Sequence, residues 1–180
     1  MPGDEEPTVE SRAIFNGHII NVRVDTIKLA DGRLARREIV EHGDTIGVVP
    51  LDGNGNVLLV EQYRKPTGRR LLEVPAGGIQ EGETPEQATL RELQEEVGYT
   101  AGKLQHLISF WLTPGFCTEL MHAYLATELQ PASLKPDYDE NVCVVPTLLS
   151  EVWDLIENNI ISDAKSVALL LMVMRMKRLF

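Results

Sequence analysis

Alternating apolar and polar positions mark the amino-terminal part of the chain as rich in β-strands. Over residues 14–41, β-branched side chains alternate with polar ones, as in Asn21-Val22-Arg23-Val24-Asp25, and Asp31-Gly32 stands where a hairpin turns. Residues 45–51 and 56–63 are short apolar runs on either side of a Gly/Asn-rich cluster that tolerates positive φ. The pattern therefore predicts two successive hairpins.

A helix with well-marked ends is predicted over residues 85–97. Thr84 is suited to cap it, the proline after Thr84 fits the first helical position, and Gln87 completes a capping box. Gly98 is suited to end the helix. The preceding stretch Val74-Pro75-Ala76-Gly77-Gly78 is expected to break regular structure.

The rest of the chain predicts strands over residues 103–110 and 120–125, a polar loop over 131–141, and helices over 150–158 and 163–175. Strands, a helix, strands and then helices indicate an α/β fold of the α+β type, with a mixed sheet. We expect one domain, because no linker separates two cores. Its parts would be a disordered tail (1–12), a β-rich segment (13–43) and a main domain (44–180).

Composition narrows the classes of partner. The 180 residues carry a formal net charge of -10, which disfavours nucleic acid and anionic membranes. The longest apolar run, residues 167–174, is far below the roughly 20 residues that cross a bilayer. Cys117 and Cys143 lack the spacing of a disulfide framework or a zinc site, so we expect reduced thiols in the cytoplasm.

Three carboxylates share one face of the predicted helix. Glu92, Glu95 and Glu96 occupy positions i, i+3 and i+4, and like charges at this spacing repel one another by roughly 0.2–0.5 kcal/mol per pair. A hard divalent cation would explain the cluster. The alternative is a solvated acidic face, because glutamate is a good helix former.

The surrounding spacing favours the cation. Gly77, five residues, Glu83, seven residues and then Arg91-Glu92-Leu93-Gln94-Glu95-Glu96-Val97-Gly98-Tyr99 resemble the Nudix box. Tyr99 and Thr89 are its two mild departures from the family pattern. The resemblance implies the Nudix fold, a mixed β-sheet sandwiched between helices, and hydrolysis of a nucleoside diphosphate linked to another group.

The resemblance also implies a set of metal ligands: Glu92 and Glu96 as the main ones, Glu95 shared or bridging, and the carbonyl of Ala76. Mg²⁺ suits oxygen ligands completed by water and phosphate, and Mn²⁺ is a substitute. Gly77 would allow close approach of the backbone. For Arg91 and Glu83, a pair tying helix to loop and a direct catalytic role both stay open. By the resemblance, Glu95 and Arg91 are assigned to the catalytic residues.

Residues outside the box resemble the ADP-ribose pyrophosphatase subfamily. The matching segments are Glu61-Gln62-Tyr63-Arg64, Leu72-Glu73-Val74-Pro75-Ala76-Gly77-Gly78 and Thr113-Pro114-Gly115-Phe116-Cys117-Thr118-Glu119, with Pro114 fifteen residues beyond Tyr99. Its dimers exchange amino-terminal strands, so the resemblance implies a homodimer.

By this resemblance, the substrate contacts are Arg64, Glu73, Arg37, Pro114 and Gly115. Arg64 offers a fork of donors to phosphate, and Glu73 accepts from sugar hydroxyls. The alternative for Arg64 and Glu73 is a strand-edge ion pair, and Arg37 is equally a solvated strand residue.

The subfamily's catalytic base usually lies in an acidic loop after the box. Here that loop is residues 135–141, and we assign Glu140, with Asp139 as the alternative. The expected reaction converts ADP-ribose to AMP and ribose 5-phosphate. GDP-mannose or another nucleotide sugar is the alternative substrate, and a non-catalytic ADP-ribose sensor is the alternative class.

Overall fold

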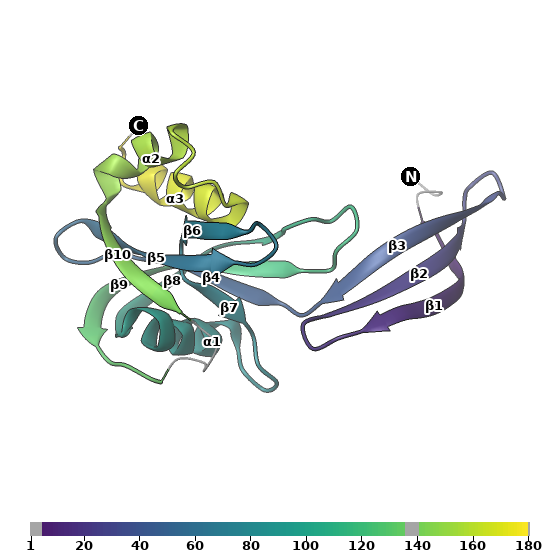
Figure 1. Cartoon of the computed structure of the whole chain (residues 1–180), viewed down its shortest axis with the longest axis horizontal. Helices are drawn as coiled ribbons and strands as arrows, with labels where there is room; N and C mark the ends of the chain where they lie inside the picture. Colours follow the sequence, from purple (N-terminus) through teal and green to yellow (C-terminus); the bar gives the residue numbers. More distant parts are fainter. Residues whose placement is uncertain (1–4, 136–140, 180) are drawn as a thin grey trace. The chain divides into compact units, whose positions relative to one another are not determined.

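The computed structural model describes residues 5–135 and 141–179 and contains mostly β-structure (Figure 1). In chain order, its elements are β1 (Thr8–Asn16), β2 (Ile20–Lys28), β3 (Leu34–His42), β4 (Thr45–Pro50), β5 (Asn56–Arg64), β6 (Arg69–Glu73), β7 (Ala76–Gly78), α1 (Pro85–Glu92), the π-turn η1 (Leu93–Val97), β8 (Tyr99–Trp111), β9 (Leu120–Pro131), β10 (Val142–Leu148), the 3-10 turn η2 (Leu149–Glu151), α2 (Val152–Glu157) and α3 (Ala164–Met176).

The chain forms two compact units, and the first contains the described residues up to Asp44 together with Phe110–Leu120. Its strands β1, β2 and β3 form an antiparallel sheet. The turn between β2 and β3 contains Gly32 at φ +85°, which confirms the predicted hairpin. Val40 N donates to Phe116 O over 2.7 Å, and this bond joins the segment Phe110–Leu120 to β3.

The prediction of a disordered tail over residues 1–12 is wrong from Thr8 onward. Strand β1 begins there and pairs with β2, with Thr8 opposite Ile27 and Arg12 opposite Val24. Every residue of β1 is exposed, so backbone hydrogen bonds rather than apolar side chains hold this polar segment. A hydrophobicity pattern does not detect such a strand.

The second unit contains the described residues of Thr45–Ser109 and Met121–Phe180 and holds two sheets, with strand orders β10-β5-β6 and β7-β4-β9-β8. Strand β4 runs parallel to β9 and antiparallel to β7, so this sheet is mixed. All six residues of β4 are buried. A strand covered on both faces is apolar throughout its length, which is the pattern that residues 45–51 show.

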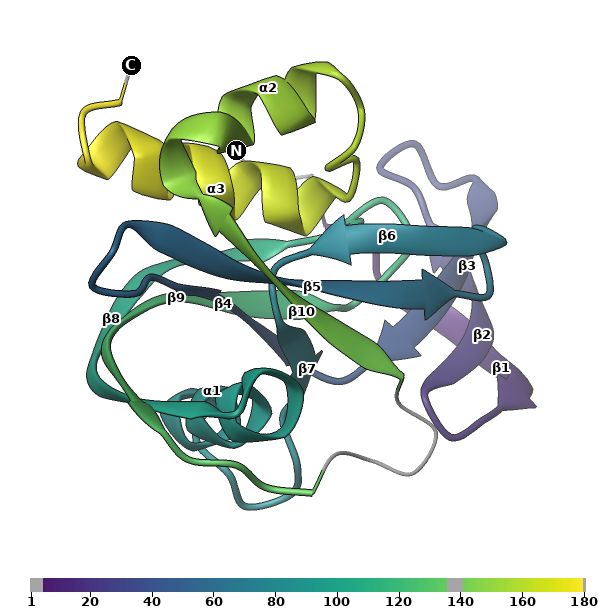
Figure 2. The same cartoon turned by 60° about the vertical axis from the view of Figure 1, so that its left-hand side comes forward.

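Helices cover the second unit on two sides. Figures 1 and 2 show α1 on one side of the strands and α2 with α3 on the other, and β4 contacts both α1 and α3. Leu169, Leu170 and Val173 of α3 are fully buried, each contributing roughly 1.5–3 kcal/mol. The arrangement confirms a mixed sheet between helices. Within the described ranges, no helix is long and apolar enough to cross a membrane.

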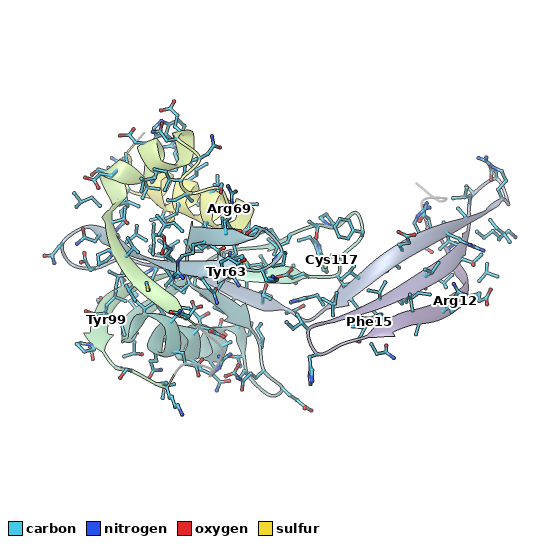
Figure 3. All side chains as sticks on the ribbon, viewed as in Figure 1. Arg12, Phe15, Tyr63, Arg69, Tyr99 and Cys117 are labelled. Carbon is cyan, nitrogen blue, oxygen red and sulfur yellow. The ribbon has the colours of Figure 1, made fainter. Side chains whose placement is uncertain are left out.

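The predicted ends of the helix over residues 85–97 are confirmed. Gln87 N donates to Thr84 Oγ1 over 3.3 Å, Thr84 N donates to Gln87 Oε1 over 2.8 Å, and Gly98 ends the segment at φ +79°. Tyr99, labelled in Figure 3, packs against the buried core, and buried Thr89 donates its hydroxyl to Pro85 O over 2.7 Å. Both departures from the family pattern therefore serve packing.

Sequence reasoning missed three strands of this unit. Strand β7 lies inside the stretch that was expected to lack regular structure, where Ala76 pairs with Gly47 of β4. Strands β6 and β10 flank β5, with Leu72 opposite Glu61 and Val144 opposite Val60. These strands exist because β4 and β5 offer backbone partners, which no local pattern reveals.

Candidate active site

The helix that carries the acidic residues changes its geometry midway. It is α-helical from Pro85 to Glu92 and then makes one π-turn over Leu93–Val97. Single π-turns often occur at functional sites. Glu92 and Glu96 are 6% and 7% exposed, whereas Glu95 is half-buried. The acidic face is therefore not a solvated one, because two of its carboxylates lie in the interior.

The two buried carboxylates meet the backbone of the glycine-rich loop. Ala76 N donates to Glu96 Oε2 over 3.1 Å. A Cβ atom at Gly77 would lie 2.0 Å from Glu92 Oε1 and 2.2 Å from Glu92 Cδ. The backbone at Gly77 therefore lies so close to Glu92 that a side chain at position 77 would displace this carboxylate, and its approach to a metal stays a prediction.

Arg91 connects Glu92 and Glu95 to the loop before the helix. Its Nε lies 2.8 Å from Glu83 Oε1, and its Nη1 lies 2.7 Å from Glu92 Oε1 and 2.8 Å from Glu95 Oε2. Its Nη2 also donates to Gly78 O over 2.9 Å. The proposed tie between helix and loop is confirmed, while catalytic roles for Arg91 and Glu95 stay predictions.

Electrostatics follow from these contacts. The hydrogen bond from Arg91 is the main cause that lowers the pKa of Glu83, and the bond to Glu83 is the main cause that raises the pKa of Arg91. Arg91 is therefore permanently charged, and Glu83 ionises more readily than an ordinary glutamate. One guanidinium thus offsets part of the repulsion among the carboxylates around it.

The residues present fit a hard divalent cation. Glu92 and Glu96 bring carboxylate oxygens to the backbone of Ala76 and Gly77, and this all-oxygen donor set matches Mg²⁺ or Mn²⁺. Among the residues that the structure describes, no three His, Cys, Asp or Glu side chains form a ready metal cluster. The fit therefore depends on water and substrate phosphate as further ligands, which Mg²⁺ usually retains.

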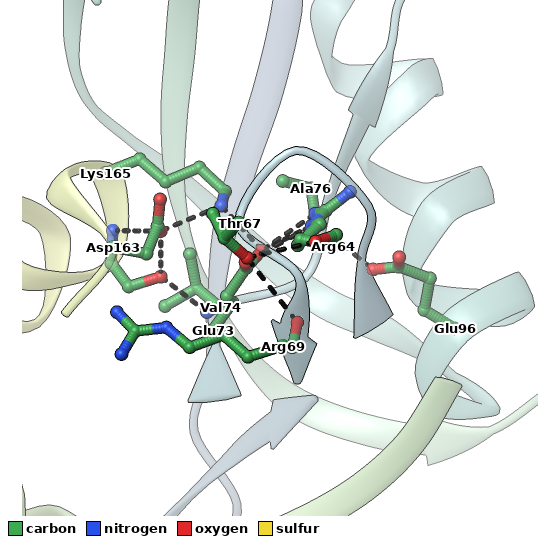
Figure 4. A network of polar contacts seen from close by, with 10 residues as sticks. Arg64, Thr67, Arg69, Glu73, Val74, Ala76, Glu96, Asp163 and Lys165 are labelled. Carbon is green, nitrogen blue, oxygen red and sulfur yellow. Dashed lines mark hydrogen bonds and ion pairs between the residues drawn. The ribbon is translucent and has the colours of Figure 1, made fainter. Parts of the chain in front are cut away.

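Arg64 and Glu73 form the ion pair that was the alternative to a substrate contact. Arg64 Nη2 lies 2.7 Å from Glu73 Oε2, and Glu73 is only 1% exposed (Figure 4). The bond to Glu73 is the main cause that raises the pKa of Arg64, and the charge of Glu96 adds to it. Substrate contact by either residue stays a prediction.

Three further residues of this network were missed by sequence reasoning. Lys165 Nζ lies 2.8 Å from Glu73 Oε2 and 2.8 Å from Asp163 Oδ2, and Ser166 Oγ accepts from Val74 N over 2.9 Å. A lysine in the first turn of a helix opposes the helix dipole. The position of Lys165 in the first turn of α3 was therefore the one signal in the sequence that a carboxylate lies near this lysine.

The remaining predicted residues lie elsewhere. Arg37 pairs with Glu6, its Nε lying 2.9 Å from Glu6 Oε2, and belongs with Pro114 and Gly115 to the first unit, which is described by itself. Their roles toward a substrate stay predictions. The assigned base Glu140 and its alternative Asp139 lie outside the described residues.

Comparison with known proteins gives two family matches and close relatives. The NUDIX domain matches residues 41–167, and the nucleoside diphosphate sugar hydrolase N-terminal domain matches residues 6–40. ADP-ribose pyrophosphatase of Bacillus subtilis is 39% identical over 92% of this chain and 91% of that protein. The methanol dehydrogenase activator of Bacillus methanolicus is 37% identical over 91% and 89%. A crystal structure of an ADP compounds hydrolase matches with a TM-score of 0.90 at 23% identity, over 99% of this chain and 97% of that one, and shares the fold.

Proposed function

This chain belongs to the Nudix hydrolase family, and from that membership we propose that it hydrolyses ADP-ribose to AMP and ribose 5-phosphate with the help of Mg²⁺. The relative named ADP-ribose pyrophosphatase aligns over nearly the whole length of both proteins and supports this substrate. A relative of similar identity is named for activating another enzyme, so a direct comparison of substrates is needed.

One observation carries the proposal: Glu92 and Glu96 are buried against the backbone of Ala76 and Gly77. Burying carboxylates is costly unless positive charge compensates them. Arg91 supplies one positive charge, and a bound cation would supply more. The site therefore has the charge and the oxygen donors that a cation-dependent hydrolase needs.

The roles of the residues follow from this arrangement. Glu92 and Glu96 would hold Mg²⁺ with the Ala76 carbonyl and Glu95, and Mn²⁺ is a substitute. When bound, the ion offsets the charge of the diphosphate and polarises its phosphoryl oxygens. Arg91 keeps Glu92 and Glu95 oriented, because it lies within hydrogen-bond distance of both.

The proposed reaction adds water across the diphosphate. The water oxygen bonds to one phosphorus, the bridging P–O bond breaks, and AMP and ribose 5-phosphate leave. We assign the proton of the attacking water to Glu140, with Asp139 as the alternative. Arg64, half-buried beside Glu73, is suited to bind a phosphate oxygen.

The test is a substrate panel in Mg²⁺: ADP-ribose, GDP-mannose, diadenosine polyphosphates and deoxynucleoside triphosphates, with the products separated by chromatography. We expect AMP and ribose 5-phosphate from ADP-ribose at the highest kcat/KM. Higher kcat/KM for GDP-mannose would select the alternative substrate, and a preference for triphosphates would contradict the proposal. Tight ADP-ribose binding without product would identify a sensor instead.

We also propose a homodimer in which the amino-terminal strands, residues 13–43, exchange between subunits. The match to the nucleoside diphosphate sugar hydrolase N-terminal domain supports it, as does an apolar groove of about 260 Å³ in the first unit. Ile14 and Phe116 line this groove and are each at least half exposed. Light scattering should give the mass of two chains, and the mass of one chain would contradict the dimer.

A cytoplasmic location completes the proposal. Both cysteines, Cys117 and Cys143, are free thiols, as is usual in reducing compartments. Fractionation of the source cells should recover the ADP-ribose hydrolase activity with the cytoplasmic fraction, and recovery from an exported fraction would contradict it.

A further inference from the structure

Two adjacent residues at the start of α3 hold two adjacent residues at the end of β6. Lys165 Nζ lies 2.8 Å from Glu73 Oε2, and Ser166 Oγ accepts from Val74 N over 2.9 Å (Figure 4). Lys165 is 8% exposed and Ser166 is fully buried. These contacts, between residues 92 positions apart, form a two-point clamp made by Lys165 and Ser166.

Asp163 orients both members of the clamp. Its Oδ2 accepts from Ser166 Oγ over 2.6 Å and from Ser166 N over 3.1 Å, and it lies 2.8 Å from Lys165 Nζ. Because the hydroxyl hydrogen of Ser166 points to Asp163, an oxygen lone pair is left for Val74 N. Burial raises the pKa of Asp163, but Lys165 and Ser166 lower it by more, so this carboxylate is charged and fixed.

The clamp holds one end of the loop that carries the metal-binding backbone. Val74 is held by Ser166, and two residues later Ala76 N donates to Glu96 on the other side of the loop. Figure 4 shows Val74 and Ala76 between α3 and Glu96. The backbone at Ala76 is therefore restrained from both sides, in addition to its pairing with Gly47 of β4, and loss of the Ser166 bond removes one of these restraints.

The clamp also sets the charge beside Arg64. Glu73 lies between two cations, with Arg64 Nη2 at 2.7 Å and Lys165 Nζ at 2.8 Å from the same oxygen. Arg64, Lys165, Glu73 and Asp163 together carry no net charge, because Lys165 also pairs with Asp163 over 2.8 Å. Without Lys165, the two carboxylates would outweigh the charge of Arg64, and an approaching phosphate would meet a net negative charge from these residues.

We propose that Ser166 and Lys165 are positioning residues of the active site, an inference that rests on the function proposed above. Ser166 holds the loop at Val74 so that Ala76 and Glu96 can share a divalent cation. Lys165 balances Glu73, so that the charge of Arg64 is available to the anionic substrate. The two residues therefore affect different ligands, the cation and the diphosphate.

The Ser166→Ala variant tests the first role through binding of Mn²⁺ alone, followed by electron paramagnetic resonance of the free ion. We expect the dissociation constant for Mn²⁺ to rise about tenfold, with KM for ADP-ribose at saturating metal within about twofold of wild type. Ser150→Ala, which removes an exposed hydroxyl in η2, is the matched control. An unchanged Mn²⁺ affinity in Ser166→Ala overturns this role.

The Lys165→Met variant tests the second role. We expect KM for ADP-ribose to rise about tenfold while kcat changes less than threefold, and Mn²⁺ to bind as tightly as in wild type or more tightly, because a positive charge has been removed. Lys165→Arg should restore KM. Lys103→Met removes an exposed lysine of β8 and is the matched control.

Ser166→Ala is expected to weaken Mn²⁺ binding and leave KM nearly unchanged, whereas Lys165→Met is expected to raise KM and leave Mn²⁺ binding intact. This difference separates positioning from a loss of stability. A weakened fold would lower both affinities in both variants, and that result, or an unchanged KM in Lys165→Met, overturns the proposal. A wild-type protein that binds Mn²⁺ but cleaves no nucleotide sugar would refute the proposed function instead. The Mn²⁺ measurement on Ser166→Ala would still decide the role of Ser166.

Discussion

Replacing Gly77 with alanine places one methyl group against the carboxylate of Glu92. The new Cβ would lie 2.0 Å from Glu92 Oε1, whereas ordinary contact begins at 3.4 Å, so the oxygen must withdraw by about 1.4 Å, the difference between these distances. The backbone is not strained, because Gly77 is not among the residues with positive φ. The substitution therefore acts on Glu92, one of the proposed metal ligands.

The size of the effect follows from that displacement. A misplacement of about 1 Å in a catalytic constellation costs roughly 100-fold in rate, which is about 2.7 kcal/mol of activation free energy. Stability should change by no more than the roughly 1.5–3 kcal/mol that a hydrogen bond between charged groups contributes, since the flexible end of Glu92 can move and only its bond to Arg91 is at stake. We expect a kcat/KM at least about 100-fold lower in a protein that still folds.

The assay is steady-state hydrolysis of ADP-ribose in Mg²⁺ combined with thermal unfolding. Gly78→Ala is the matched control, because a Cβ atom at Gly78 meets no atom within 4 Å. That neighbouring substitution should keep kcat/KM within about threefold of wild type. If Gly77→Ala also kept a third of the wild-type kcat/KM, the contact between the loop and Glu92 would not support catalysis.

Three other substitutions probe the same charges. Glu96→Gln removes a negative charge from the proposed metal ligands, so we expect hydrolysis to fall by orders of magnitude. The unfolding midpoint should not change, because the amide keeps an oxygen that can accept from Ala76 N. Unchanged turnover would remove Glu96 from the metal ligands. Arg91→Met leaves three carboxylates without their shared guanidinium and should lower the free energy of unfolding by about 2–3 kcal/mol in urea titrations, and a loss below about 0.5 kcal/mol would contradict the tie. The pKa of Glu83 is lowered in the folded protein, so its ionised carboxylate stabilises the fold fully above the ordinary pKa of 4.5. This stabilisation is lost as the pH falls through the lowered pKa. Glu83→Gln should therefore lose less stability than wild type between about pH 5 and 3 in urea titrations, and parallel curves would contradict this assignment.

Spacing along the chain predicted the part of the site that lies within one short segment. The positions of Gly77, Glu83 and Arg91 are fixed relative to one another by a capped helix and the loop before it. These interactions connect residues that are near in sequence, and helix geometry translates their spacing into contacts. For the same reason, the sequence could indicate which carboxylates of this segment are the proposed metal ligands.

The acidic face shows where spacing alone fell short. The i, i+3 and i+4 positions predicted three carboxylates on one face and said nothing of their burial, yet Glu92 and Glu96 are buried while Glu95 is half-buried. The π-turn beginning at Leu93 and the packing against the loop create that difference. Burial depends on what covers a helix, and a helical pattern does not contain that information.

Edge strands were the least predictable part of the fold. Strand β1 is wholly exposed, and β7 is a three-residue strand of small residues. Neither has the alternation on which strand prediction depends. Their formation depends on the backbone partners that β2 and β4 present, so it was decided by pairing rather than by residue type.

The sequence by itself determined the helix ends, the close approach at Gly77 and the acidic residues that face the loop, because these depend on residues close together along the chain. Only the tertiary structure decided that Glu73 would be buried between Arg64 and Lys165, and that Ser166 would hold Val74. Those partners come together only when α3 packs against the strands of the second unit. Their free energy comes from excluding water around paired charges, which requires the completed fold.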